Sequence, residues 1–358
     1  MCIADKLQII LITYNRASYV KKTFEQLFYE GSPINNYDFF VLDNNSTDNT
    51  HDVVEQQQLK NKNIRYFKNK YNLGISGNIA KAMEMANKEY VWIISDDDKY
   101  DFSNWNEIEK AINNNEKLIC LSRYTIEEKN KNDIAYQLLQ LTFIPAIIFK
   151  TSLFNDNTIR NSFDNIFTLF PHLYPIIPLI NNNEKIYVVN KAIVDNGMDI
   201  KNTDCSYIRG LKFTELCQRT RSMSWIVGYV NVCSMIKDKK LKNKIINTAI
   251  EYIHGNFYKF CKFIFVNYSW NTDYMQIIDV YMQLSFLNKL LFFVLYIQTR
   301  ILSILLKQNF VEINFCFLKI KFEVIRYKEG DYSLVKYKFV TIKKNLTTGK
   351  ISVSFYNK

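Results

Sequence analysis

Three consecutive carboxylates, Asp96, Asp97 and Asp98, carry the strongest chemical signal in this chain. They follow the apolar run 90–94, whose pattern is typical of a strand buried on both faces. Carboxylates at the carboxyl end of such a strand are hard oxygen ligands that could hold Mg²⁺ or Mn²⁺ across two phosphates. The alternative is a solvated acidic turn, and the preceding 90 residues bear on the choice.

The first third of the chain alternates strand and helix patterns. Apolar runs predict strands at 7–12, 39–42, 64–67 and 90–94, and helical patterns at 18–29, 46–54 and 75–87 separate them. This order predicts an α/β fold with a mostly parallel sheet flanked by helices. Polar residues at the carboxyl ends of the strands should then face one crevice.

The four polar segments at these strand ends are TYNR at 13–16, DNNSTD at 43–48, NLGISGN at 72–78 and DDD at 96–98. In this order and spacing, they resemble the family 2 glycosyltransferases, whose fold is of the GT-A type. The resemblance covers about residues 7–200. It implies that the nucleotide-sugar is bound by Thr13, Tyr14, Asn15, Arg16, Asp43, Asn72, Gly74, Asn78 and Asp96. It also implies that Asp97 and Asp98 hold a Mn²⁺ or Mg²⁺ ion on the diphosphate.

Each of these assignments has a physical rationale and a structural alternative. A carboxylate such as Asp43 can accept the N–H of uracil, and Tyr14 offers a stacking face. Asp43 could equally be a turn former, Gly74 a plain loop glycine and Asn78 an ordinary surface residue. The metal motif of the family is written Asp-x-Asp, which Asp96 and Asp98 match. Aligning by the strand end favours Asp97 and Asp98 instead, with Asp96 nearer the ribose.

The general base is the least defined part of the site. In the family, an Asp or Glu at a helix start activates the acceptor hydroxyl for a single, inverting displacement. The corresponding region, 163–174, has no Glu-Asp pair. His172, which follows Pro171 at a predicted helix start, and Asp164 are the candidates, and a purely structural histidine is the alternative.

The last 150 residues lie outside the resemblance. The pattern predicts domains at 1–208 (catalytic), 209–308 (helical and amphipathic) and 309–358 (a small basic β-hairpin element). The apolar stretch 284–306 is interrupted by polar and charged residues, which favours an amphipathic helix over a membrane span. Residues 309–358 contain ten Lys or Arg and four Asp or Glu. They form either a solvated surface or a platform for an anionic membrane or lipid-linked acceptor.

Composition sets further limits on the protein. A net charge of +11 indicates an anionic partner, but the acidic crevice and the absence of a binding motif oppose nucleic acid. Seven cysteines without Cys-x-x-Cys spacing suggest neither a zinc site nor a disulfide framework. The first residues do not resemble a signal peptide, so the expected location is the cytoplasm, with peripheral attachment at the inner membrane face. The oligomeric state stays open.

Together these features predict an inverting, metal-dependent glycosyltransferase. It would move a sugar from a nucleotide-sugar, UDP-linked by preference, to a hydroxyl of a glycan or lipid-linked acceptor in surface polysaccharide synthesis. One alternative is a sugar nucleotidyltransferase, which should show a Gly-rich phosphate loop after the first strand. The other is a non-catalytic, carbohydrate-binding relative, which the missing base motif would suit.

Overall fold

The structure is a computed structural model that describes residues 3–122, 132–195, 197, 225–267, 274–307 and the strands between 310 and 355. It divides into two compact units, residues 1–253 and 254–358. The domain limits expected at 208 and 308 lie outside the described residues. Both limits therefore stay predictions.

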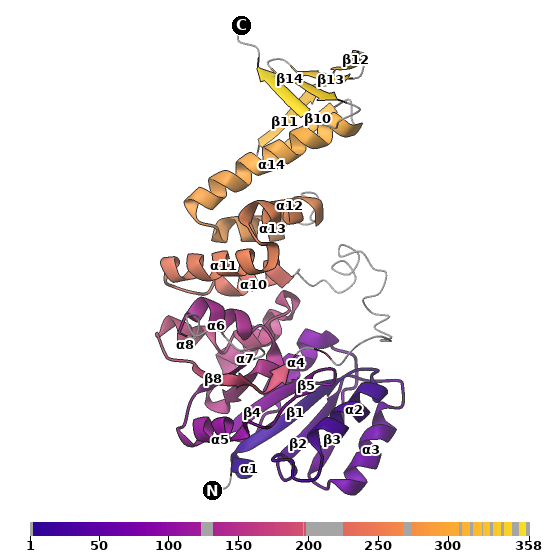
Figure 1. The fold of residues 1–358 in the computed structure, drawn as a ribbon, viewed down its shortest axis with the longest axis vertical. Helices are drawn as coiled ribbons and strands as arrows, with labels where there is room; N and C mark the ends of the chain where they lie inside the picture. The colour runs from indigo at the N-terminus through magenta and orange to yellow at the C-terminus, as the bar shows by residue number, and fades with distance from the viewer. Residues whose placement is uncertain are drawn as a thin grey trace. The chain divides into compact units, whose positions relative to one another are not determined.

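A seven-stranded sheet forms the centre of the first unit (Figure 1). In spatial order its strands are β3 (Ile64–Lys68), β2 (Asp38–Asp43), β1 (Leu7–Thr13), β4 (Tyr90–Ser95), β7 (Ile147–Lys150), β6 (Leu118–Ser122) and β8 (Tyr187–Ala192). The first four run parallel, and β6 pairs in parallel with β8. Only β7 is antiparallel to its neighbours in this sheet. The predicted mostly parallel α/β sheet is confirmed.

Both faces of the sheet are covered, which explains the continuous apolar runs of its strands. Leu7, Ile9 and Leu11 of β1 belong to the core beneath α2 (Ala17–Leu27), α3 (Thr50–Lys60) and α5 (Trp105–Asn113). On the other face, α4 (Gly74–Glu84) contacts β1, β4 and α7 (Asp156–Asp164). Every residue of β1 is buried as a result.

The carboxyl ends of the parallel strands meet where the strand order reverses. β1 lies between β2 and β4, so the chain leaves β1 toward one side of the sheet and later returns on the other. Thr13 is in register with Asp43, and Ile12 with Ser95. In open α/β sheets, ligands bind outside the carboxyl ends of the strands at such a reversal. The fold thus brings the predicted segments together.

Shorter elements complete the first unit. They are α1 (Ile3–Lys6), β5 (Lys99–Tyr100), α6 (Ile134–Gln140), η2 (Ile144–Ala146), η3 (Thr151–Leu153), η4 (Ile166–Thr168), η5 (Pro171–Leu173), α8 (Ile177–Asn181), β9 (Val194–Asp195), α10 (Trp225–Cys233) and α11 (Lys239–His254). β5 and β9 pair antiparallel, which brings Gly197 next to the loop after β4.

The second unit combines helices and antiparallel strands. Its helices are α12 (Phe257–Asn267), α13 (Tyr274–Gln283) and α14 (Phe286–Lys307). β10 (Phe310–Phe315) pairs with β11 (Leu318–Glu323), and β12 (Ile325–Glu329), β13 (Tyr332–Tyr337), β14 (Val340–Asn345) and β15 (Ile351–Phe355) form a four-stranded sheet. These strands exceed the single hairpin expected from the sequence. Among the described residues, no helix has the length and apolarity needed to cross a membrane.

Candidate active site

The loop after β1 binds the loop after β4 through Asp96. Thr13 Oγ1 donates a hydrogen bond of 2.6 Å to Asp96 Oδ2, and Thr23 Oγ1 on α2 donates to the Asp96 carbonyl at 2.8 Å. Arg16 Nη1 lies 2.9 Å from Asp96 Oδ1 and 2.7 Å from Asp97 Oδ2. Both carboxylate oxygens of Asp96 therefore have donors from the end of β1 and the segment that follows it. Four of the predicted site residues meet here.

Asp98 has a different environment from its two neighbours. It is 4% exposed, and its Oδ1 accepts a hydrogen bond of 3.3 Å from the Gly197 amide. Its Oδ2 is buried without a hydrogen-bond partner among the described residues. A buried carboxylate oxygen that lacks a donor is costly in free energy. Such an oxygen is suited to a cation.

Burial and mutual repulsion raise the pKa of two carboxylates of the triplet. Burial raises the pKa of Asp98 to about 7, and the charge of Asp97 adds to the increase. Burial also raises the pKa of Asp96 to about 6, although Arg16 opposes this. Burial disfavours the charge of Arg16, but Asp96 and Asp97 outweigh it and raise its pKa above the ordinary value. A divalent cation would favour the ionised form of Asp96 and Asp98.

Asp97 and Asp98 supply hard oxygen atoms of the kind that Mg²⁺ or Mn²⁺ prefers, and Asp98 Oδ2 has no hydrogen-bond donor among the described residues. The three carboxylates of the triplet do not, however, form a group whose ligand atoms all lie within 4.8 Å of one another. A second group of potential ligands, His51, Asp52 and Glu55 on α3, has ligand atoms within 4.8 Å of one another. All three of these side chains are exposed, and exposed acidic groups are common without an ion. The triplet is therefore the better candidate.

Asp43, the predicted base-binding residue, is fully buried and already hydrogen-bonded. Its Oδ1 accepts hydrogen bonds from the Ser46 amide at 2.8 Å and the Ser46 hydroxyl at 2.5 Å. Its Oδ2 accepts one from the Tyr66 hydroxyl at 2.5 Å. Burial and this bond to Asp43 raise the pKa of Tyr66. Because a carboxylate oxygen can accept two hydrogen bonds, Oδ2 retains capacity for one base N–H.

Asn15 connects the loops after β1 and β2. Its backbone is left-handed, with φ of 51°, a conformation that Asn tolerates better than most residues. Its amide donates to Ser46 Oγ at 2.8 Å, and its Oδ1 accepts from the Thr47 amide at 2.7 Å. Tyr14, between Thr13 and Asn15, is half-buried. Tyr14 therefore precedes a residue that is hydrogen-bonded to the loop after β2.

The segment after β3 is tied to the same edge by asparagines. Asn72 Oδ1 accepts from Asn44 Nδ2 and from the Gly74 amide, both at 2.8 Å. Gly74 has φ of 71°, which requires a residue that tolerates left-handed backbone. Asn78 is buried: its Oδ1 accepts from Asn69 Nδ2 at 2.8 Å and its Nδ2 donates to the Leu42 carbonyl at 3.3 Å. Asn72 is exposed, so it can reach a ligand directly, whereas Asn78 supports the end of β2.

The two candidate bases lie in different environments. His172 is 1% exposed on η5, and its Nε2 lies 3.1 Å from the Leu141 carbonyl. Its Nδ1 is buried without a partner among the described residues. Burial lowers the pKa of His172 to about 4. Asp164 is exposed at the end of α7. His172 is therefore neutral at pH 7, and its role as base stays a prediction, as does that of Asp164.

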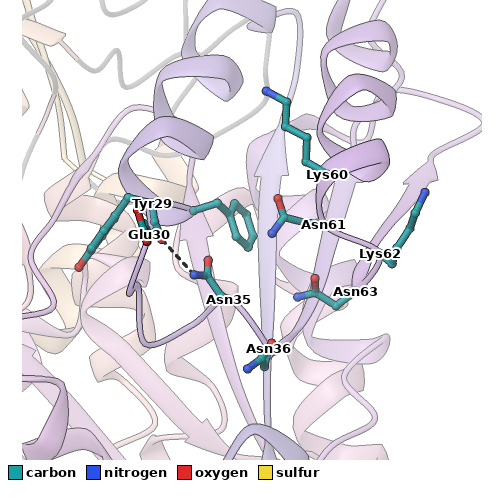
Figure 2. Close-up of a pocket in the computed structure, with 9 residues that line it drawn as sticks. Tyr29, Glu30, Asn35, Asn36, Lys60, Asn61, Lys62 and Asn63 are labelled. Atoms are coloured by element: carbon teal, nitrogen blue, oxygen red, sulfur yellow. Dashed lines mark hydrogen bonds between the residues drawn. The ribbon is translucent and has the colours of Figure 1, made fainter.

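A pocket of about 600 Å³ lies at the opposite edge of the sheet (Figure 2). Its lining comes from the ends of α2 and α3 and from the loops before β2 and β3, and includes Asn35, Asn36 and Asn63. The acidic triplet and the other predicted site residues follow the strands rather than precede them. This pocket is separate from the candidate active site.

Several residues of the site carried no signal that sequence reasoning recognised. Tyr66 and Ser46 hold Asp43, and Thr23 holds the loop of Asp96. Asn44 and Asn69 connect the loops after β2 and β3. The clustering of asparagines at the strand ends could have indicated this network. Tyr66 and Thr23 could be found only from the strand order and the packing of α2.

Comparisons with known proteins agree with this geometry. Residues 8–176 match the Glycosyl transferase family 2 model. The GalNAc(5)-diNAcBac-PP-undecaprenol beta-1,3-glucosyltransferase of Campylobacter jejuni is 32% identical over 95 residues, which are 26% of this chain and 30% of that protein. The poly(ribitol-phosphate) beta-glucosyltransferase of Bacillus spizizenii is 24% identical over 191 residues, which are 47% of this chain and 30% of that protein.

Solved structures show the same fold. S. aureus TarS 1–349 in complex with UDP-GlcNAc superposes with a TM-score of 0.54 at 16% identity, over 78% of this chain and 80% of that one. The aligned regions of the two curated relatives each make up less than a third of their length. Residues 8–176, a little under half of the chain, thus match the glycosyltransferase family 2 model, and the fold is of the GT-A type.

Proposed function

We propose that this chain is an inverting, metal-dependent glycosyltransferase that transfers a sugar from a UDP-sugar to a hydroxyl of a polymeric or lipid-linked acceptor. The observation that carries the proposal is the convergence of Thr13, Arg16 and Asp96 at the point of strand reversal. Next to them, Asp98 Oδ2 has no hydrogen-bond partner in the described part of the chain. The similarity to glycosyltransferases of cell-surface glycans supports the choice of acceptor class. The reaction would take place at the cytoplasmic face of the membrane, where nucleotide-sugars are made.

Each side of the crevice would have its own task. Asp43, with Ser46 and Tyr66 holding it, would orient the base, and Tyr14 would stack on it. Asp97 and Asp98 would hold Mn²⁺ or Mg²⁺, which when bound supplies positive charge to the leaving diphosphate. An acceptor hydroxyl would attack the anomeric carbon from the opposite side and lose its proton to a base, so the configuration inverts. His172 and Asp164 are the candidates for that base.

A non-catalytic relative is the second candidate, because His172 is buried and its Nε2 is already engaged by Leu141. A panel of UDP-, GDP- and dTDP-sugars in a thermal-shift assay tests donor binding, since a ligand at 100 times its Kd adds about 2.7 kcal/mol to stability. Donor hydrolysis with Mn²⁺ and with EDTA then separates an active transferase from a binding protein. Binding without turnover would favour the second candidate, and no binding would refute both.

The carboxylates provide the site-specific part of this test. Asp98→Asn should lower turnover by at least about a hundredfold, because it removes a ligand to the ion that stabilises the transition state. Asp52→Asn, in the exposed group on α3, is the matched control and should leave turnover unchanged. Full turnover of Asp98→Asn, or of the unmodified chain in EDTA, would refute the metal assignment.

A further inference from the structure

Arg16 joins two carboxylates that the proposed function gives different tasks. One nitrogen, Nη1, lies 2.9 Å from Asp96 Oδ1 and 2.7 Å from Asp97 Oδ2. The Asp96 side chain is almost fully buried, whereas the side chains of Arg16 and Asp97 are partly exposed. Asp96 also accepts from Thr13, so Asp97 is the partner that Arg16 can release at the lower cost. A released guanidinium would still be held at the crevice by Asp96.

Asp98 lies outside this ion pair. The charged contacts of Arg16 join it to Asp96 and Asp97, and Asp98 Oδ2 has no hydrogen-bond partner in the described part of the chain. Within the triplet, Asp98 Oδ2 can thus accept a positively charged group, whereas Asp97 is already paired with Arg16. A cation that uses both Asp97 and Asp98 must compete with Arg16 for Asp97.

We propose that Arg16 is an exchangeable internal counter-ion of the acidic triplet: it occupies Asp97 in the free protein and yields it when a divalent cation binds at Asp98. This inference rests on the proposed function, which supplies the cation and the diphosphate. Arg16 is a positioning residue in this scheme. Once displaced from Asp97, its guanidinium can donate to a phosphate oxygen of the nucleotide, because such charge-assisted bonds suit arginine geometry.

The exchange couples two binding events. Mn²⁺ alone must displace Arg16 without a new partner for it, whereas Mn²⁺ together with UDP offers the guanidinium a phosphate. Mn²⁺ and UDP should therefore bind cooperatively, and by linkage each strengthens the other by the same factor. Couplings of this kind are typically about 5- to 150-fold. Removing the guanidinium should strengthen the binding of Mn²⁺ alone and reduce the coupling.

Electron paramagnetic resonance of free Mn²⁺ measures both quantities without any turnover. The full chain and Arg16→Gln are titrated with Mn²⁺, with and without UDP. We expect UDP to strengthen Mn²⁺ binding at least about fivefold in the unmodified chain. Arg16→Gln should bind Mn²⁺ alone about tenfold more tightly and lose most of the coupling. Arg65→Gln, which breaks the pair with Asp38 on β2 and β3, is the control and should change neither.

Two results would overturn the inference. The first is that Arg16→Gln binds Mn²⁺ alone with the same or weaker affinity than the unmodified chain. The second is that Mn²⁺ and UDP do not bind cooperatively to the unmodified chain. The second result can be obtained even if the variant does not fold. The two proposals fail separately. If the unmodified chain transfers sugar but Arg16→Gln binds Mn²⁺ with unchanged affinity, only the counter-ion role of Arg16 is refuted. If Arg16→Gln binds Mn²⁺ more tightly but the unmodified chain has no transfer activity, only the proposed function is refuted.

Discussion

His172 should make the stability of this protein depend on pH in the weakly acidic range. Its ring is 1% exposed, and burial lowers its pKa from 6.5 to about 4. The unfolded chain therefore binds a proton at a pH where the folded chain does not. Stability from this residue is fully present above about pH 6.5 and is lost as pH falls toward 4. The whole effect is about 3 kcal/mol, since each pKa unit corresponds to about 1.4 kcal/mol.

The comparison with His172→Gln isolates this contribution. Gln cannot titrate, but its amide can still donate to the Leu141 carbonyl, which His172 Nε2 contacts at 3.1 Å. Urea unfolding at pH 7 and pH 5 should show that the unmodified chain loses about 2 kcal/mol more than the variant. Burial raises the pKa of Asp98 to about 7, so that residue gains stability on acidification, but equally in both proteins. It therefore cancels in the difference.

A constant stability difference between pH 7 and pH 5 would refute the reasoning, because it would mean that the ring is exposed to solvent. His51→Gln, the same substitution at an exposed histidine, is the control. The His172→Gln variant also tests catalysis. With His172 as base, His172→Gln should abolish transfer and retain nucleotide binding. Unchanged turnover would leave the role to Asp164 or another group.

Two further predictions concern packing and membrane contact. Gly228→Ala on α10 should lower the unfolding free energy by at least about 3 kcal/mol, because a Cβ there would lie 1.9 Å from the Thr168 carbonyl oxygen of η4. Gly31→Ala is the control, since a Cβ there has open space but φ is 80°, and it should lower the unfolding free energy by only about 1 kcal/mol. If Gly228→Ala has the same unfolding free energy as the unmodified chain, the close contact between α10 and η4 is wrong. On α14, Leu287 and Leu290 are exposed, and we expect the chain to co-sediment with anionic liposomes in low salt and leave them in high salt. Leu287→Asp with Leu290→Asp should abolish this binding; equal binding to neutral liposomes would refute the electrostatic part.

The parallel half of the sheet could be predicted because strands buried on both faces appear as continuous apolar runs. β1, β2 and β4 begin and end within one residue of their expected limits. The antiparallel β7 was not predicted. It has four residues, and residues 123–146, which include α6, separate it from its partner β6, so no local pattern indicates the pairing. Strand order is a property of long-range packing and not of periodicity.

Helix starts were predicted less well, for a reason connected with the site. The first helix was expected to begin at residue 18, but α2 begins at Ala17 after Arg16, whose side chain makes no cap bond and instead binds Asp96 and Asp97. The next helix was expected from Ser46 and begins at Thr50, because Ser46 is engaged by Asp43. Capping rules apply to side chains that are free to hydrogen-bond the backbone N–H groups at a helix start. A side chain that already bonds a carboxylate of the site does not cap the helix.

The same distinction separates the predicted site residues that face a ligand from those that shape the crevice. Sequence spacing identified Asn78 and Asp96 as polar residues at strand ends, and the structure buries both in hydrogen bonds to neighbouring loops. Buried polar networks that are fully paired are rigid, so these residues would hold Tyr14, Asn72, Asp97 and Asp98 in place before the nucleotide binds. A crevice prepared in this way loses little conformational entropy on binding. Asp98 Oδ2, which is buried without a hydrogen-bond partner among the described residues, is where a cation would then add to the affinity.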